Sequence, residues 1–108
     1  MRMFRPIPRA ALPDTMSVRL QLDDGAFGEP AVVVGVRFDE VQSESDDGHR
    51  SADGGAGTVF VDAVNSAGAF EVPVGSRVAV RGRSYIVRKC HRCEDLFGRC
   101  HHWELEVG

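Results

Sequence analysis

The sequence predicts an all-β fold: a small β-barrel of about five to seven mostly antiparallel strands, with an extended N-terminal arm and one long flexible loop. Apolar and polar residues alternate with a period of two through most of residues 16–108, as in strands with one buried face. Residues 1–15 hold three prolines, and residues 42–57 hold no apolar side chain larger than alanine. At 108 residues the chain is one domain by size, with an arm over residues 1–15 and a barrel over residues 16–108.

Prolines 6, 8 and 13 predict that the N-terminal segment is an extended arm, because proline fixes φ and removes a backbone donor. The arm also carries more apolar side chains than a solvated tail needs. We expect it to lie against a surface of its own subunit or of a neighbour; the apolar residues are Met3, Phe4, Ile7 and Leu12.

The first two strands are predicted from alternation within residues 17–22 and 31–41. We expect one buried face of the first strand to carry Val18, Leu20 and Leu22, and one face of the second to carry Val32, Val34 and Val36. Gly35, inside the second strand, predicts a bulge or bend of the kind that barrels need at corners.

Residues 42–57 form the predicted flexible loop, since they cannot bury enough surface to offset the entropy of ordering. A third strand is predicted over residues 58–62, followed by a turn region over residues 63–69. Asp62 and Asn65 flank this turn, where such side chains commonly bond the backbone, and we expect both to be structural.

The C-terminal segment, residues 74–107, predicts a meander of three strands joined by turns at Gly82-Arg83 and around Gly98. Tyr85 lies on the apolar face of the middle strand. Trp103, the lone tryptophan, lies on the apolar face of the last strand, so we expect both aromatics to be structural core residues.

Composition describes an ordinary soluble chain, with 43% apolar and 27% charged residues. No apolar run approaches the roughly 18 residues of a membrane span, and no signal peptide is recognisable, so we expect cytoplasmic synthesis and no membrane partner. Residues 23–62 hold ten acidic residues and two arginines, a net charge of −8. This acidic stretch argues against a general nucleic-acid-binding surface.

One cluster has the chemistry of metal ligands. Cys90, Cys93, Cys100 and His101 (or His102 in its place) would supply the four sulfur and nitrogen ligands of a tetrahedral zinc site. The alternative is that the cysteines only pack, because residues three apart in a strand point to opposite faces. No orienting acid or oxyanion site accompanies the cluster, so we predict no catalytic residues and no enzyme.

Three segments carry a resemblance to a known family: TVFVDAVNS (residues 58–66), VGSRVAVRGRSYIVRKC (74–90) and GRCHHWELEV (98–107). In this order, together with Arg5 to Pro8 and Val36-Arg37-Phe38, they resemble the minor capsid proteins of tailed bacteriophages and prophages, which are small head–tail connector proteins. The resemblance implies a virion structural protein with no required cofactor.

The resemblance further implies that copies of the chain form a ring at the neck of the particle. Its partners would be the portal or adaptor and the tail or other neck proteins, with DNA only as passing cargo. The predicted contact residues are Arg5, Pro6, Ile7 and Pro8 in the arm and Asp46 and Asp47 in the acidic loop. The alternative function is a small β binding module stabilised by zinc at the cysteine cluster.

Overall fold

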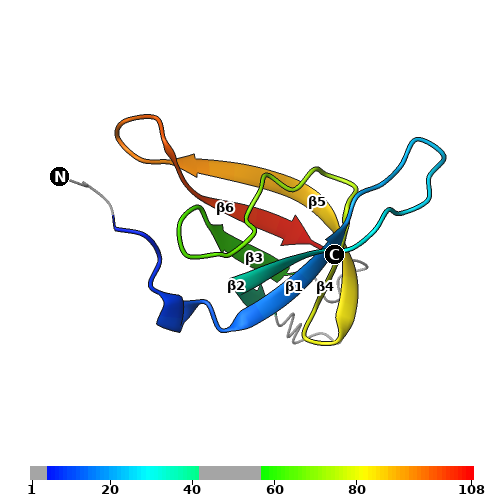
Figure 1. Ribbon diagram of the computed structural model, residues 1–108, viewed down its shortest axis with the longest axis horizontal. Coiled ribbons are helices and arrows are strands. Elements are labelled where there is room, and N and C mark those ends of the chain that lie inside the picture. The colour runs from blue at the N-terminus through cyan, green and yellow to red at the C-terminus, as the bar shows by residue number, and fades with distance from the viewer. Residues whose placement is uncertain (1–4, 42–56) are drawn as a thin grey trace, which may run out of the picture.

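The computed structural model describes residues 5–41 and 57–108, which form a closed antiparallel barrel (Figure 1). The all-β prediction is confirmed, and the one helix of the described residues is the short 3-10 turn η1. The strands follow one another around the barrel in the order β1-β2-β3-β6-β5-β4, with β4 pairing back onto β1. The elements are η1 (Arg9–Ala11), β1 (Asp14–Arg19), β2 (Ala31–Glu40), β3 (Gly57–Asp62), β4 (Arg77–Val80), β5 (Arg83–Glu94) and β6 (Cys100–Val107).

The barrel interior is filled by side chains, most of them valines, whose branched shape packs well on a pleated surface. Phe38 is the largest fully buried side chain, and its ring centroid lies 5.2 Å from that of Tyr85. The other core members are Met16, Val18, Val33, Val36, Val59, Val61, Val72, Val78, Val80, Val87, Leu105 and Val107.

The first strand begins earlier than predicted. β1 starts at Asp14, so the arm ends at residue 13, and the strand buries Met16 and Val18. Leu20 and Leu22, expected on the buried face, are 44% and 50% exposed, which corrects that prediction. The reason is that β1 ends at Arg19 and the chain leaves the sheet there.

In β2 the predicted apolar face is correct for Val36 and wrong for Val32 and Val34, and Gly35 is the cause. Gly35 has φ +87° and is left without a partner, because Thr15 pairs with Val34 and Asp14 with Val36. This bulge adds one residue to the alternation, so Val33 and Val36 both face the core while Val32 and Val34 face outward. The bulge predicted at Gly35 is therefore present, but it changes the phase of the strand.

Barrel closure is secured where β1 starts. Both carboxylate oxygens of Asp14 accept hydrogen bonds from the Arg81 guanidinium, each at 3.0 Å, and Oδ2 also accepts from the Phe38 backbone N–H at 2.9 Å. Arg81 is presented by the two-residue β4–β5 turn, in which Arg81 and Gly82 have φ of 51° and 75°. The turn lies one residue earlier than predicted.

The C-terminal meander is present as predicted, with Tyr85, Leu105 and Val107 on the inner face. Trp103 is half-buried at one end of the barrel, where it packs against the core and its Nε1–H donates to Glu71 at 3.2 Å. β5 and β6 are longer than the other C-terminal strand, so their paired ends project as a hairpin at one end of the molecule (Figure 1).

Gly57 lies in β3, although the sequence placed it in the loop, and a side chain there has no room. A Cβ atom would lie 2.5 Å from the Phe38 ring and 2.7 Å from the Asp39 carbonyl oxygen. We expect Gly57→Ala to lower the free energy of unfolding by about 1–3 kcal/mol in urea titrations. Gly28→Ala is the control, since its Cβ would meet only ordinary contacts, and we expect a change within about 0.5 kcal/mol. Equal stability of the two variants would contradict this packing.

We expect Asp14 to make the stability of the barrel depend on pH. Burial acts to raise the pKa of Asp14, but hydrogen bonds from Arg81 and Phe38 and the charges of Arg81 and Arg37 together hold it below its ordinary value. A lowered folded-state pKa adds stability above the unfolded pKa, near about 4, and that stability is lost as pH falls through the folded pKa.

We therefore expect Asp14→Asn to unfold at lower urea concentration than wild type at neutral pH, with the difference vanishing near about pH 2. Asp39→Asn is the control, because Asp39 pairs with Arg37 at a half-exposed position. A difference between wild type and Asp14→Asn that does not change with pH would refute the role of this carboxylate's charge.

Candidate functional site

The candidate site is the base of the β5–β6 hairpin, where the N-terminal arm and the end of β3 meet it. β3 and β6 pair as far as Asp62 and His102, and beyond this point β5 and β6 continue as the hairpin. The arm reaches the same end of the barrel before it enters η1 (Figure 1). Segments from both ends of the sequence therefore converge here.

Asp62 anchors this region. Its side chain is fully buried, and its Oδ2 accepts from the backbone N–H groups of Val64 (2.9 Å) and Asn65 (2.7 Å) in the following turn. Its Oδ1 accepts from the N–H of Ile7 in the arm at 2.9 Å. Three backbone donors thus compensate the burial of one carboxylate.

Asn65 completes the attachment of the arm. Its Nδ2 donates to the Ile7 carbonyl oxygen at 2.8 Å, so Ile7 is held through both of its backbone polar groups. Ser66 ties the same turn to β2, because its hydroxyl donates to the Gly35 carbonyl oxygen and accepts from the Asp62 N–H. The turn, the arm and the bulge of β2 therefore form one connected unit.

A second attachment joins the arm to the hairpin. His101 Nε2 lies 2.6 Å from the carbonyl oxygen of Arg5, and its Nδ1 lies 2.8 Å from Nδ1 of His102. Nε2 of His102 in turn lies 2.9 Å from Oε2 of Glu104. A continuous chain of polar contacts therefore runs from the arm, across the start of β6, to its outer face.

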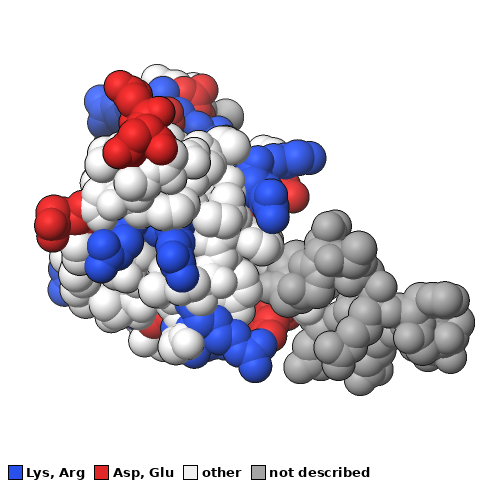
Figure 2. Space-filling view, turned by 90° about the vertical axis from the view of Figure 1, so that its right-hand side faces the viewer, with Lys and Arg blue, Asp and Glu red and all other residues white. Residues whose placement is uncertain are grey.

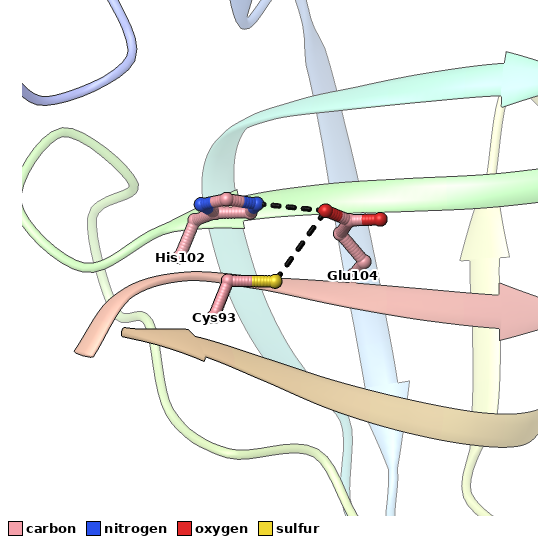
Figure 3. A group of neighbouring side chains, drawn as sticks. All are labelled: Cys93, His102 and Glu104. Atoms are coloured by element: carbon pink, nitrogen blue, oxygen red, sulfur yellow. Dashed lines mark hydrogen bonds and ion pairs between the residues drawn. The ribbon is translucent and has the colours of Figure 1, made fainter. Parts of the chain in front are cut away.

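Cys93, His102 and Glu104 gather on the outer face of the hairpin (Figure 3). Cys93 lies directly opposite His102 in the β5–β6 register, and Glu104 is two residues further along the same face of β6. The Cys93 thiol donates to Glu104 Oε2 at 3.4 Å, and the three ligand atoms all lie within 4.8 Å of one another. All three residues are half-buried.

The titration of two of these groups is shifted by their contacts. The hydrogen bond from His102 is the main cause that holds the pKa of Glu104 below its ordinary value, with further help from Cys93. Burial raises the pKa of the Cys93 thiol, and the neighbouring Glu104 raises it further. Without a bound cation, the cluster therefore consists of a carboxylate facing a protonated thiol.

The zinc ligands predicted from the sequence are not brought together. Within the described residues, the one group of three or more possible metal ligands is Cys93 with His102 and Glu104. Cys90 faces inward, where it packs against the core opposite Leu105, and Cys100 lies across the hairpin near Arg92. Alternation along the strands thus places Cys90 and Cys93 on opposite faces of β5.

The structure describes the arm residues that were predicted to contact partners, but not the predicted contact residues of the acidic loop. Arg5, Pro6, Ile7 and Pro8 lie against their own barrel through the contacts of Arg5 and Ile7, and contact with a neighbour stays a prediction. Asp46 and Asp47, with nearly all of the predicted loop, lie outside the described residues. Sequence reasoning missed Glu104 as a partner of the cysteine cluster; a predicted register for the β5–β6 hairpin would have placed it there.

The sequence matches a known protein family over most of its length. Residues 8–107 match the family model described as Minor capsid protein, which is nearly the whole chain. No curated protein and no solved structure gives a significant match. No helix of the described residues is long and apolar enough to cross a membrane.

We expect Asp62→Ala to destabilise the domain by about 3 kcal/mol or more, because three backbone donors lose their acceptor. Urea unfolding followed by Trp103 fluorescence measures this change. Asn65→Ala is the milder variant, with an expected cost of about 1 kcal/mol and faster amide exchange at Ile7. Asp39→Ala, at a half-exposed site, should have little effect on the free energy of unfolding. A similar loss of stability in Asp39→Ala would show that the effect of Asp62→Ala does not arise from its three backbone hydrogen bonds.

Proposed function

The chain belongs to the minor capsid protein family, and on this premise we propose that it is a head–tail connector subunit of a tailed phage or prophage particle. The proposed role is structural and non-enzymatic. Copies made in the bacterial host cytoplasm assemble into a closed ring at the neck of the virion, between the portal or adaptor and the tail. The observation that carries the proposal is a pair of exposed apolar surfaces on opposite sides of the barrel.

The first surface is the tip of the β5–β6 hairpin. Leu96 and Phe97 are 65% and 66% exposed there, which is unusual for adjacent large apolar side chains. Asp95 holds the tip in shape, because its Oδ1 accepts from the backbone N–H groups of Phe97 (2.8 Å) and Arg99 (3.0 Å). A tip that is ordered in advance loses little entropy on binding.

The second surface is the outer face of β2, where the bulge at Gly35 turns Val32 and Val34 outward. These side chains are 56% and 52% exposed. In the closed order of six strands, β2 and β5 are separated by two strands in either direction, so they lie on opposite sides of the barrel. The tip on one copy can therefore contact the β2 face of the next copy without using the same surface twice.

Such a contact is heterologous, and its repetition generates a ring when the rotation between copies closes. The backbone edge of β5 over residues 88–94 is a less suitable contact, although no described strand pairs with it on the side away from β6. This edge carries Arg88, Lys89, His91 and Arg92, and charges of this kind protect an edge against strand addition. We therefore assign the subunit contact to the apolar tip.

The distribution of charge supports DNA as passing cargo. Figure 2 shows the end opposite the hairpin, where acidic and basic side chains are interspersed in small groups over a largely uncharged surface. The described residues on this face form no continuous basic patch of the kind that neutralises phosphates. The net charge of the whole chain, −3, also disfavours tight binding of DNA.

The test is the assembly state of the purified chain in sedimentation and light scattering. We expect the wild type to self-associate, and Phe97→Glu and Val32→Glu each to remain monomeric, because a charge at either surface removes the contact. Val74→Glu, at a 62% exposed position outside both surfaces, is the matched control and should assemble like wild type.

Mixing the two monomeric variants identifies the geometry of the contact. Val32→Glu keeps an intact tip and Phe97→Glu keeps an intact β2 face, so a heterologous contact predicts a dimer containing one copy of each. A wild type that stays monomeric, variants that assemble normally, or a mixture that stays monomeric would each contradict the proposed contact.

A further inference from the structure

The cluster of Cys93, His102 and Glu104 has the dimensions of a zinc site. In a tetrahedral site, the bond lengths of zinc to sulfur, nitrogen and oxygen place the ligand atoms about 3.4–3.6 Å apart. Glu104 Oε2 already lies 2.9 Å from His102 Nε2 and 3.4 Å from Cys93 Sγ. Small side-chain rotations therefore suffice to surround an ion, without any movement of the paired strands.

The contacts around His101 and His102 hold the His102 ring in one orientation. His102 Nδ1 lies 2.8 Å from His101 Nδ1, and His101 Nε2 lies 2.6 Å from the Arg5 carbonyl oxygen. The other ring nitrogen of His102, Nε2, lies 2.9 Å from Glu104 Oε2, in the group that also contains Cys93.

A metal ion at His102 Nε2 leaves the contact at His102 Nδ1 in place. His102 then donates its Nδ1–H to Nδ1 of His101, and His101 donates its Nε2–H to the Arg5 carbonyl. A metal-binding histidine normally donates its second N–H to such an acceptor, which fixes the ring orientation. Here the supporting groups are already in place in the folded chain.

We propose that Cys93, His102 and Glu104 bind a zinc ion, with a fourth coordination position open to solvent. The combination of one thiolate, one imidazole and one carboxylate suits Zn²⁺, whereas magnesium and calcium prefer oxygen ligands alone. On binding, the thiol releases its proton to solvent and no electron is transferred. Cys90 and Cys100 have no part in the site.

The site also connects the metal to the N-terminal arm. The ion orients His102, His102 orients His101, and His101 holds the backbone of Arg5. Zinc therefore stabilises the docked arm, which Asp62 and Asn65 hold independently at Ile7. The barrel core contains none of the three ligands, so removal of the ion leaves the barrel folded.

The test uses the full-length, reduced, metal-free chain titrated with Co²⁺ and then with Zn²⁺. Co²⁺ reports a thiolate ligand through a charge-transfer absorption band, and Zn²⁺ displaces it with one-to-one stoichiometry. We expect Cys93→Ala to abolish the band, and His102→Ala and Glu104→Gln to weaken zinc binding at least about tenfold. Circular dichroism verifies that each variant is folded.

The matched control is the double variant Cys90→Ala/Cys100→Ala, which removes the other two thiols and should keep the band and the zinc affinity. A band that persists in Cys93→Ala, a band that is lost in the double variant, or no binding of either metal by the wild type would each overturn the proposal. Assembly of the chain is measured separately and does not depend on these outcomes.

The connection to the arm has its own readout. His101→Ala keeps all three proposed ligands, so the cobalt band should persist while zinc affinity falls by about 10–100-fold. In the wild type, zinc should slow amide exchange in the arm around Ile7, and in His101→Ala it should not. Equal zinc affinity of His101→Ala and wild type would refute the supporting role of His101.

Discussion

The buried carboxylate of Asp62 is the constraint on which this end of the molecule depends. A carboxylate without exposure must have its acceptor capacity used, and here the donors are the backbone of the next turn and of the arm. The N–H of the same residue is bonded through Ser66 to the bulge in β2. One residue therefore determines where β3 ends, how the turn folds and where the arm lies.

The hairpin carries the exposed apolar tip and the cluster of Cys93, His102 and Glu104, neither of which belongs to the buried core. β5 pairs with β4 over Arg83 to Ile86 and with β6 from Val87 to Glu94. β6 pairs with β3 only as far as His102, so the end of the β5–β6 hairpin projects beyond the barrel. The apolar tip lies at the end of this projection, and the proposed zinc ligands lie near its base on the outer face. A change at either place can alter binding while the core remains intact.

The parts of the fold that follow from alternation alone were predictable, and those that depend on pairing were not. Tyr85, Leu105 and Val107 lie on the inner face as the meander pattern indicated. β2 broke the pattern because the bulge at Gly35 reverses its phase, and spacing cannot show on which side of a bulge the core lies. The grouping of Cys93 with His102 also depends on pairing: Cys93 meets His102 across the hairpin, while its neighbours in the sequence face away.

The two proposals, subunit assembly and zinc binding, use different surfaces of the chain, and the bulge in β2 accounts for this separation. Because Gly35 turns Val32 and Val34 outward, the apolar face for a neighbouring copy lies on the side of the barrel away from the hairpin. A tip that reaches this face leaves the base of its own hairpin uncovered, where the half-buried cluster of Cys93, His102 and Glu104 lies. Assembly and metal binding can therefore coexist on one small domain, since a contact at the tip requires no surface that the ion or the docked arm occupies.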